Sequence, residues 1–220
     1  MHKSNQQVDK VKILLKIEKL LKEANIDATE EQLDKLATLV VLLCKWNQAL
    51  NLTAIRDPDD MVVLHIIDSA VLSPLVAQRG KNIADVGTGA GFPGLVLAIL
   101  NPNIKFTLID SIAKKLSFVR TAMVSLNLKN VNLINDRCEN IKIDEKFDCI
   151  VSRAFAPLSK IVQWCKELIS DNGTFVAMKA NLEPNELEEI PDYAVILDNI
   201  DLKVPTLDAK RQAVILKLQN

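Results

Sequence analysis

The chain has 220 residues, of which 49% are hydrophobic and 25% are charged, so its composition predicts a globular protein with a sizeable core and excludes a wholly disordered one. Its formal net charge of −1 excludes a global basic field that would draw it onto nucleic acid or a membrane surface. Any contact with nucleic acid must therefore use a local patch. The longest nearly apolar run, Leu36–Cys44, is too short to span a bilayer, and Met1–Lys10 has no apolar signal core. We expect a cytoplasmic protein without a membrane partner.

The cysteines and histidines offer no metal-ligand spacing. The four cysteines lie far apart and form no C-x-x-C pair, and the sequence has only two histidines. We therefore expect no metal site, and we expect the thiols to be buried in a reducing compartment. These cysteines are Cys44, Cys138, Cys149 and Cys165.

Helical patterns fill residues 1–79, where glycine is absent. The first predicted helix carries its apolar stripe at Val11, Leu14, Ile17 and Leu21. The segment Thr29–Gln32 has the composition of a capping box and opens a second helix, whose stripe is Leu33, Leu36, Ala37, Val40 and Leu43. A third helix opens at Asp57-Pro58 and stops near Pro74. Residues 1–79 are predicted to form a small helical subdomain.

Short apolar runs alternate with helical patterns in residues 80–220, which are predicted to form the second domain. The predicted strands are Asn82–Val86, Phe106–Asp110, Val131–Ile134, Phe147–Ser152, Thr174–Met178, Tyr193–Leu197 and Ala213–Leu218. The predicted helices between them are Leu95–Leu100, Lys114–Leu126 and Leu158–Leu168. This alternation predicts an α/β fold with a mostly parallel sheet and helices on both faces. The last two strands, without a helical pattern between them, are predicted to form a hairpin at one edge.

Four of the six glycines stand in one segment, Gly87–Gly94, directly after the first predicted strand. Glycine lets the backbone turn tightly, and a ligand can approach it without meeting a Cβ. Ligands of open α/β sheets bind beside such a turn, outside the carboxyl ends of the strands. We interpret the segment as a ligand-binding loop; the structural alternative is a turn that serves only close packing of helix and strand. Its candidate binding residues are Gly87, Gly89, Gly91 and Phe92.

Two acidic residues near this loop bear on the choice of ligand. The loop also matches the dinucleotide fingerprint G-x-G-x-x-G, so an NAD-dependent oxidoreductase is an alternative. Asp85 stands just before the loop, where a carboxylate is adverse beside a pyrophosphate and favourable beside the positive charge of S-adenosylmethionine. Asp110 ends the second strand, where it can accept hydrogen bonds from the ribose of either cofactor. Asp85 therefore favours S-adenosylmethionine, and Asp110 does not discriminate.

Several short segments occur in this chain in a combination and order that are specific to one protein family. They are Trp46-Asn47, Asn51–Thr53, His65–Ser69, Asp85–Gly94, Leu108–Ser111, Ser152–Ala156 and Met178-Lys179. With these segments the chain resembles the RsmG (GidB) family of small-subunit ribosomal RNA methyltransferases. The resemblance implies a Rossmann-like class I methyltransferase fold with a seven-stranded sheet behind an N-terminal helical region. It also implies that a methyl group passes from S-adenosyl-L-methionine to N7 of guanine 527 in 16S rRNA.

The resemblance assigns roles to individual residues, all at the carboxyl ends of predicted strands. Gly87 and Phe92 would line the cofactor, Asp110 would hold its ribose, and Cys138-Glu139 would border its adenine. Arg153 would close the pocket, and Arg153 and Lys179 are the candidates for positioning the substrate. No side chain is expected to act as a catalytic proton acceptor.

Further polar residues have both a structural and a functional interpretation. His65 and Asp68, three residues apart on a helix, can hydrogen-bond one another; we favour a buried clamp between the helical subdomain and the sheet over a surface that faces the active site or the RNA. Trp46 and Asn47, at a helix end, are interpreted as a subdomain lock in preference to a base-stacking platform. Candidates for a phosphate-contacting rim are Lys114, Lys115, Arg120, Arg137, Lys179, Lys210 and Arg211.

The expected partner is 16S rRNA or the small ribosomal subunit, bound by a monomer. A second alternative, besides the oxidoreductase, is a non-catalytic RNA-binding protein with a vestigial methyltransferase fold. Guanine N7 carries a lone pair and no proton, so its methylation needs no general base, unlike that of an amine or a ribose hydroxyl. The fourth strand ends in Ser152–Phe155, which lacks the amide site typical of amine methylation. This pattern agrees with N7 chemistry.

Overall fold

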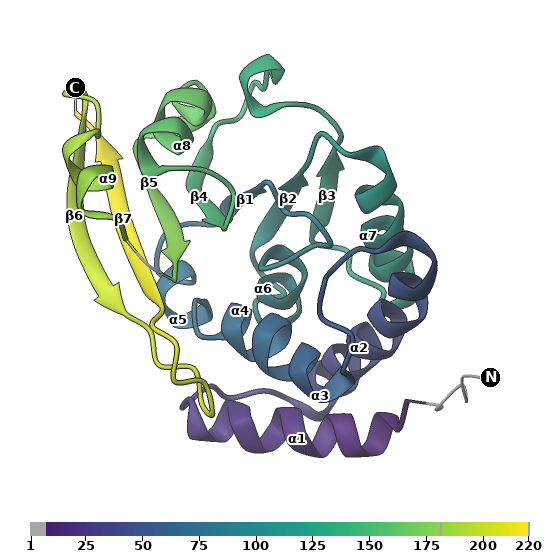
Figure 1. The fold of residues 1–220 in the computed structure, drawn as a ribbon. Helices are drawn as coiled ribbons and strands as arrows, with labels where there is room; N and C mark the ends of the chain where they lie inside the picture. Colours follow the sequence, from purple (N-terminus) through teal and green to yellow (C-terminus); the bar gives the residue numbers. More distant parts are fainter. Residues whose placement is uncertain (1–7, 181, 220) are drawn as a thin grey trace.

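The computed structural model describes residues 8–180 and 182–219. Its centre is one seven-stranded sheet in the order β3-β2-β1-β4-β5-β7-β6 (Figure 1). The strands are β1 Asn82–Val86, β2 Lys105–Ile109, β3 Val131–Ile134, β4 Phe147–Arg153, β5 Ile169–Lys179, β6 Ala194–Asp201 and β7 Gln212–Leu218. The seven-stranded, mostly parallel sheet and the expected hairpin at one edge are thereby confirmed.

Helices precede the sheet and connect its strands. Before the sheet come α1 Lys10–Glu23, α2 Glu30–Leu50, α3 Pro58–Met61, η1 Val62–Ile67, α4 Asp68–Ala70 and α5 Ser73–Val76. Within it come α6 Gly94–Leu100, α7 Ala113–Ser125, η2 Cys138–Asn140, α8 Leu158–Cys165 and α9 Pro184–Glu188. The connections β1–β2, β2–β3 and β4–β5 cross over through α6, α7 and α8, the helices that the sequence pattern predicts, whereas the connection from β3 to β4 contains only the short η2.

The hairpin of β6 and β7 closes one side of the sheet. Strand β7 pairs antiparallel with both β5 and β6, so β7 lies inside the sheet and β6 forms its edge. Because β7 runs against its neighbours, its first residue, Gln212, lies beside Lys179 at the end of β5. This brings the preceding Arg211 to the edge where the parallel strands end.

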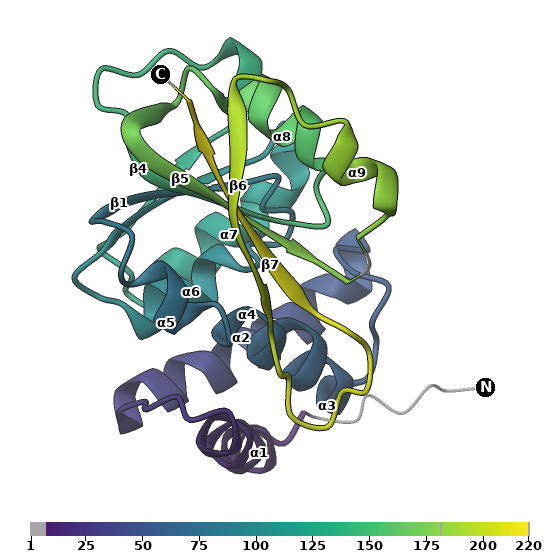
Figure 2. The same cartoon turned by 90° about the vertical axis from the view of Figure 1, so that its left-hand side faces the viewer.

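The two faces of the sheet are covered by different helices. In Figure 2, α8 and α9 lie above the sheet, whereas α2, α6 and α7 lie below it. The lower face and the N-terminal helices share one buried cluster, which runs from Ile13 on α1 to Ala213 on β7. The upper face packs a second cluster against α8, with Phe175 completely buried. At ~25 cal/mol per Å² of buried apolar surface, these two clusters dominate the favourable energy of folding.

The second helix begins where its capping box predicts. The Thr29 hydroxyl accepts from the backbone N–H of Gln32, and the Gln32 side chain accepts from the backbone N–H of Thr29. Gln32 also donates to the carbonyl oxygens of Ile99 and Leu100 at the end of α6. The predicted stripe of α2 is buried throughout. The cap therefore also fixes α2 to the helix that follows the glycine loop.

The buried face of α1 differs from the predicted stripe. Its buried residues are Ile13, Ile17, Leu20 and Leu21. Val11 is 69% exposed and does not belong to the buried stripe, whereas Leu14 is partly buried and packs against the core. Leucine and isoleucine stand on several sides of this helix, and its contact with α2 decides which side is buried.

The third predicted helix is not a regular α-helix. Between α3 and α4 the backbone forms a π-helical segment, η1, and the N–H of Asp68 bonds the carbonyl oxygen of Val63 five residues back. Such wider turns change the direction in which side chains point and are frequent at functional sites. They are invisible to a search for 3.6-residue periodicity.

All the strands of the described residues lie after residue 80, but the buried core is continuous across this position. Residues 1–79 as a subdomain and residues 80–220 as a methyltransferase domain therefore remain a prediction. No helix in residues 8–180 and 182–219 has the length and apolar character needed to cross a bilayer.

Candidate functional site

Two cavities lie next to each other where the parallel strands end. The first, of about 480 Å³, is lined by the loop after β1, the end of β4, the start of β7 and the helical segment that contains His65. The second, of about 410 Å³, is lined by the ends of β1, β2 and β4 and by η2. Both include Gly87 and Ala154, so they adjoin at these two residues. We call them the loop cavity and the η2 cavity.

The four glycines of the loop have different physical reasons to be glycine. A Cβ on Gly91 would collide with the Leu95 side chain, and one on Gly94 would lie 2.7 Å from Asp85 Oδ2, so these two serve packing. Gly87 lies directly against the Phe155 ring. A Cβ on Gly89 would meet no described protein atom nearer than 4.0 Å, although Gly89 lines the loop cavity. Gly89 therefore leaves open space for a ligand.

Asp85 does not take the place that the sequence analysis expects. Its side chain is completely buried and lines neither cavity, because Oδ2 accepts hydrogen bonds from the Thr88 hydroxyl and the backbone N–H of Gly94. Burial raises its pKa to about 6. Asp85 therefore stabilises the conformation of the glycine loop through these hydrogen bonds. Direct contact between Asp85 and a positively charged ligand is not supported. Gly91, also expected at the cofactor, likewise lies outside both linings.

The η2 cavity contains Asp110, Cys138 and Glu139 together. The Asp110 carboxylate accepts from the N–H of Gly89 and the N–H of Ile112, both at 2.8 Å, and so ties the glycine loop to the end of β2. Each carboxylate oxygen has a second lone pair, so Asp110 can also accept from hydroxyl groups of a ligand. The Cys138 thiol donates to the Glu139 carboxylate at 3.3 Å. The expected ribose and adenine residues thus line one cavity.

Asp68 connects three parts of the chain at the loop cavity. Its Oδ2 lies 2.9 Å from Nη1 of Arg153 on β4, and its Oδ1 lies 2.7 Å from Nε of Arg211 before β7. The Asp68 side chain is 4% exposed, and the two arginines are 17% and 16% exposed. Removing one partner from such a buried group leaves an uncompensated charge, which is strongly destabilising. The expected clamp between helices and sheet is confirmed, with arginine as the sheet's contribution.

His65 does not hydrogen-bond Asp68 as expected, because the π-helical segment turns both side chains towards Arg153. Nδ1 of His65 lies 3.3 Å from Nη2 of Arg153, and Nε2 lies 2.9 Å from the Thr53 hydroxyl. The imidazole stacks on the Phe92 ring with centroids 4.8 Å apart. Burial, and then the charge of Arg153, lower the pKa of His65 to about 3, so the imidazole is neutral at physiological pH.

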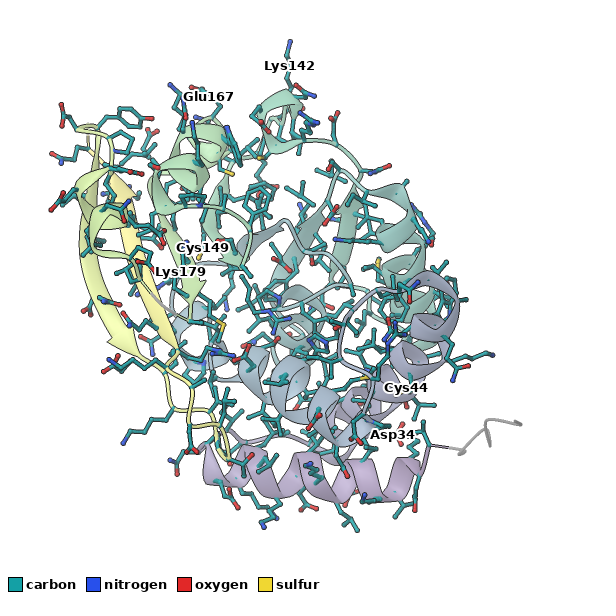
Figure 3. All side chains as sticks on the ribbon, in the orientation of Figure 1. Asp34, Cys44, Lys142, Cys149, Glu167 and Lys179 are labelled. Carbon is teal, nitrogen blue, oxygen red and sulfur yellow. The ribbon has the colours of Figure 1, made fainter. Side chains whose placement is uncertain are left out.

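The basic rim is only partly as expected. Lys179, labelled in Figure 3, donates to Glu186 at 2.7 Å and to the carbonyl oxygen of Ala156, and it is 13% exposed. Together with Arg211, it is engaged by a carboxylate and is not a free phosphate contact. Lys115 and Arg137 line the η2 cavity. Of the predicted rim, Lys114, Arg120 and Lys210 are exposed and line neither cavity.

The sequence analysis missed several residues of the site. Phe155 and Trp164 meet edge to face, with centroids 5.8 Å apart, and both line the η2 cavity. Phe155 follows the end of β4, and its position at the carboxyl edge of the sheet could have indicated a site residue. Trp164 lies on α8, and nothing in the sequence indicated that it lines the cavity. Trp46 packs against Phe118 of α7, so it joins the N-terminal helices to a helix of residues 80–220.

The residues present fit a nucleoside-based cofactor with an extended tail. Two adjoining cavities of several hundred Å³ suit a ligand of that size. The η2 cavity offers aromatic surface and a carboxylate with free lone pairs, while the open side of Gly89 leaves room in the loop cavity.

Comparison with known proteins identifies the family. The family model for rRNA small subunit methyltransferase G matches residues 32–215. A ribosomal RNA small subunit methyltransferase G of Psychromonas ingrahamii is 43% identical over 205 residues, 93% of this chain and 98% of that protein. One from Pasteurella multocida is 45% identical over 202 residues, 92% of this chain and 95% of that protein. The N-methyltransferase NodS from Bradyrhizobium japonicum, solved with S-adenosyl-L-homocysteine, has a TM-score of 0.57 at 13% identity and covers 79% of this chain and 98% of its own; it supports the class I methyltransferase fold. The chain thus belongs to the rRNA small subunit methyltransferase G family.

Proposed function

We propose that this protein transfers a methyl group from S-adenosylmethionine to N7 of guanine 527 in 16S rRNA. Membership of the family supports methylation of small-subunit rRNA with this methyl donor. The observation that carries the choice of N7 is the absence of a free proton acceptor among the described residues that line the loop cavity.

The titratable groups of that cavity are all unsuited to removing a proton. The pKa of His65, about 3, makes its imidazole a very weak base. Both oxygens of Asp68 are held by arginines, and Lys179 is paired with Glu186. Guanine N7 has an exposed lone pair and loses no proton when it is methylated, whereas an exocyclic amine or a ribose hydroxyl must lose one. N7 is thus the guanine atom whose methylation this cavity suits best.

The cofactor would occupy both cavities. Asp110 would accept hydrogen bonds from the ribose hydroxyls, and Cys138 and Glu139 would border the adenine. Gly87 would line the cofactor where the two cavities adjoin. The bound group supplies an electrophilic sulfonium methyl. Arg153 and Lys179, at the ends of β4 and β5, would position the guanine in line with it, and this alignment would supply much of the rate enhancement.

The decisive experiment locates the transferred methyl group. Small ribosomal subunits and free 16S rRNA, each from cells that lack the modification, are incubated with the protein and radiolabelled S-adenosylmethionine. N7-specific chemical cleavage should then show one methylated guanine, number 527. The single-turnover rate should show no requirement for a group that deprotonates near neutral pH. A methyl group on an exocyclic nitrogen or a ribose oxygen would falsify the proposal.

Binding measurements distinguish the alternatives from the sequence analysis. Calorimetry should detect S-adenosylhomocysteine and no NADH, because the family to which the chain belongs uses S-adenosylmethionine as its methyl donor. Tight NADH binding would favour the oxidoreductase. RNA binding without any methyl transfer would favour a vestigial methyltransferase.

A further inference from the structure

The Thr53 hydroxyl has a defined hydrogen-bonding state because of its two neighbours. An arginine guanidinium only donates, so Nδ1 of His65, which lies 3.3 Å from Arg153, must accept. A neutral imidazole has one N–H, which therefore stands on Nε2 and donates to the Thr53 Oγ1 at 2.9 Å. The backbone N–H of Ile55 donates to the same oxygen at 3.2 Å. Both lone pairs of the hydroxyl are thus in use.

The proton of this hydroxyl is left for a ligand. Thr53 lines the loop cavity, and its hydroxyl has no acceptor among the residues that the structure describes. A half-buried donor that points to no acceptor loses the energy of a hydrogen bond unless a ligand or water supplies one. The three groups Arg153, His65 and Thr53 therefore form a chain that presents one oriented donor to the cavity.

The charge balance of the cavity indicates an anionic acceptor. Arg153, Arg211 and Lys179 line it, and they are paired with only two carboxylates, Asp68 and Glu186. Among these groups one positive charge is in excess at the cavity wall, where charges are poorly screened, and the buried Asp85 beneath the loop offsets part of it. This excess favours a carboxylate over a neutral base oxygen.

The location of Thr53 indicates which carboxylate this is. Thr53 bonds His65, and His65 stacks on Phe92 at the end of the glycine loop, so Thr53 lies on the loop side of the cavity. A cofactor whose nucleoside lies in the η2 cavity must pass its amino-acid tail over Gly87 into this space. We propose that the Thr53 hydroxyl donates a hydrogen bond to the methionyl carboxylate of S-adenosylmethionine. His65 and Arg153 orient this hydroxyl.

The test compares two ligands that differ only in the tail. Calorimetry measures binding of S-adenosylhomocysteine, which carries the carboxylate, and of 5′-methylthioadenosine, which lacks the amino-acid part. Thr53→Val should weaken S-adenosylhomocysteine about tenfold to a hundredfold, as expected for a hydrogen bond to a charged group, and leave methylthioadenosine unchanged. Thr53→Ser, which keeps the donor, should retain the affinity for both ligands.

Two further variants keep the result interpretable. Thr53→Ala also removes the hydroxyl and replaces Thr53→Val in the test if Thr53→Val folds poorly. It should weaken S-adenosylhomocysteine binding and leave methylthioadenosine binding unchanged. Thr38→Val is the matched control, because the Thr38 hydroxyl bonds only the backbone of α2, at Asp34, and lines neither cavity. Equal weakening of both ligands, or no weakening of either, overturns the proposal. Weaker RNA binding with unchanged S-adenosylhomocysteine affinity also overturns it, because the donor then serves the base. These measurements need no RNA methylation, so they stand if the N7 assignment fails.

Discussion

At the scale of single residues, the glycine loop separates ligand binding from packing. Gly89 has φ +60° and open space at its Cβ position, whereas Gly91 has φ +89° and faces the Leu95 side chain. Gly89→Ala should cost roughly 1–2 kcal/mol of stability through its left-handed backbone and should reduce S-adenosylhomocysteine affinity by more than tenfold, because the new methyl group enters the ligand space.

Gly91→Ala is the matched comparison for this prediction. It carries the same backbone cost and adds a collision in the core, so its free energy of unfolding should fall further than that of Gly89→Ala. Urea denaturation measures stability and calorimetry measures affinity. A Gly89→Ala protein that binds the ligand as tightly as the original would show that Gly89 does not face the cofactor.

His65 gives the protein a defined pH dependence. Its pKa of about 3 in the folded protein lies below the ordinary value of 6.5, so the unfolded chain takes up a proton first as the pH falls. The contribution of His65 to stability is therefore complete above pH 6.5 and is lost on going towards pH 3, by roughly 2 kcal/mol between pH 6.5 and 5. Asp85, whose pKa is raised to about 6, acts in the opposite direction between pH 3.8 and 6.

A histidine variant separates these two effects. His65→Gln retains Asp85 and should lose less stability than the original protein between pH 6.5 and 5 in urea denaturation. Equal losses in the two proteins would show that His65 is not buried in its neutral form.

At the scale of elements, the capping box of α2 is the local signal with the clearest energetic consequence. Thr29→Ala removes the side-chain acceptor of the first turn and should lower the free energy of unfolding by about 1 kcal/mol. Thr38→Ala, in the middle of the same helix, removes a hydroxyl that bonds only the helix backbone at Asp34 and should change the free energy of unfolding by less than about 0.5 kcal/mol. Thermal and urea denaturation of both variants provide the comparison. Equal effects at the two positions would contradict a specific role for the cap.

At the scale of the whole molecule, the shared core predicts one cooperative unit. The two tryptophans report on opposite faces of the sheet, because Trp46 packs on Phe118 below it and Trp164 lies on α8 above it. In the variants Trp46→Phe and Trp164→Phe, the remaining tryptophan should give the same urea midpoint as circular dichroism does for that variant. A midpoint from Trp46 that lies below the circular-dichroism midpoint would instead make residue 80 a boundary between folding units.

The sequence by itself determined the features that local chemistry controls. The capping box at Thr29 needs only residues three apart, the alternation of strands and helices sets the order of crossovers, and the clustered glycines mark the loop after β1. These signals do not depend on distant partners, and for that reason they predicted the mostly parallel sheet, the helices α6, α7 and α8 between its strands, and the edge at which the two cavities lie.

Only the tertiary structure decided which polar groups meet. Asp68 lies 85 and 143 residues from its two arginines, and Asp85 is turned away from the cavities because Thr88 and Gly94 bind its carboxylate. The π-helical segment directs His65 towards Arg153, and this direction in turn leaves Thr53 as a donor. Such pairings depend on three-dimensional proximity and on competition among donors and acceptors, and neither is encoded in the spacing of residues along the chain.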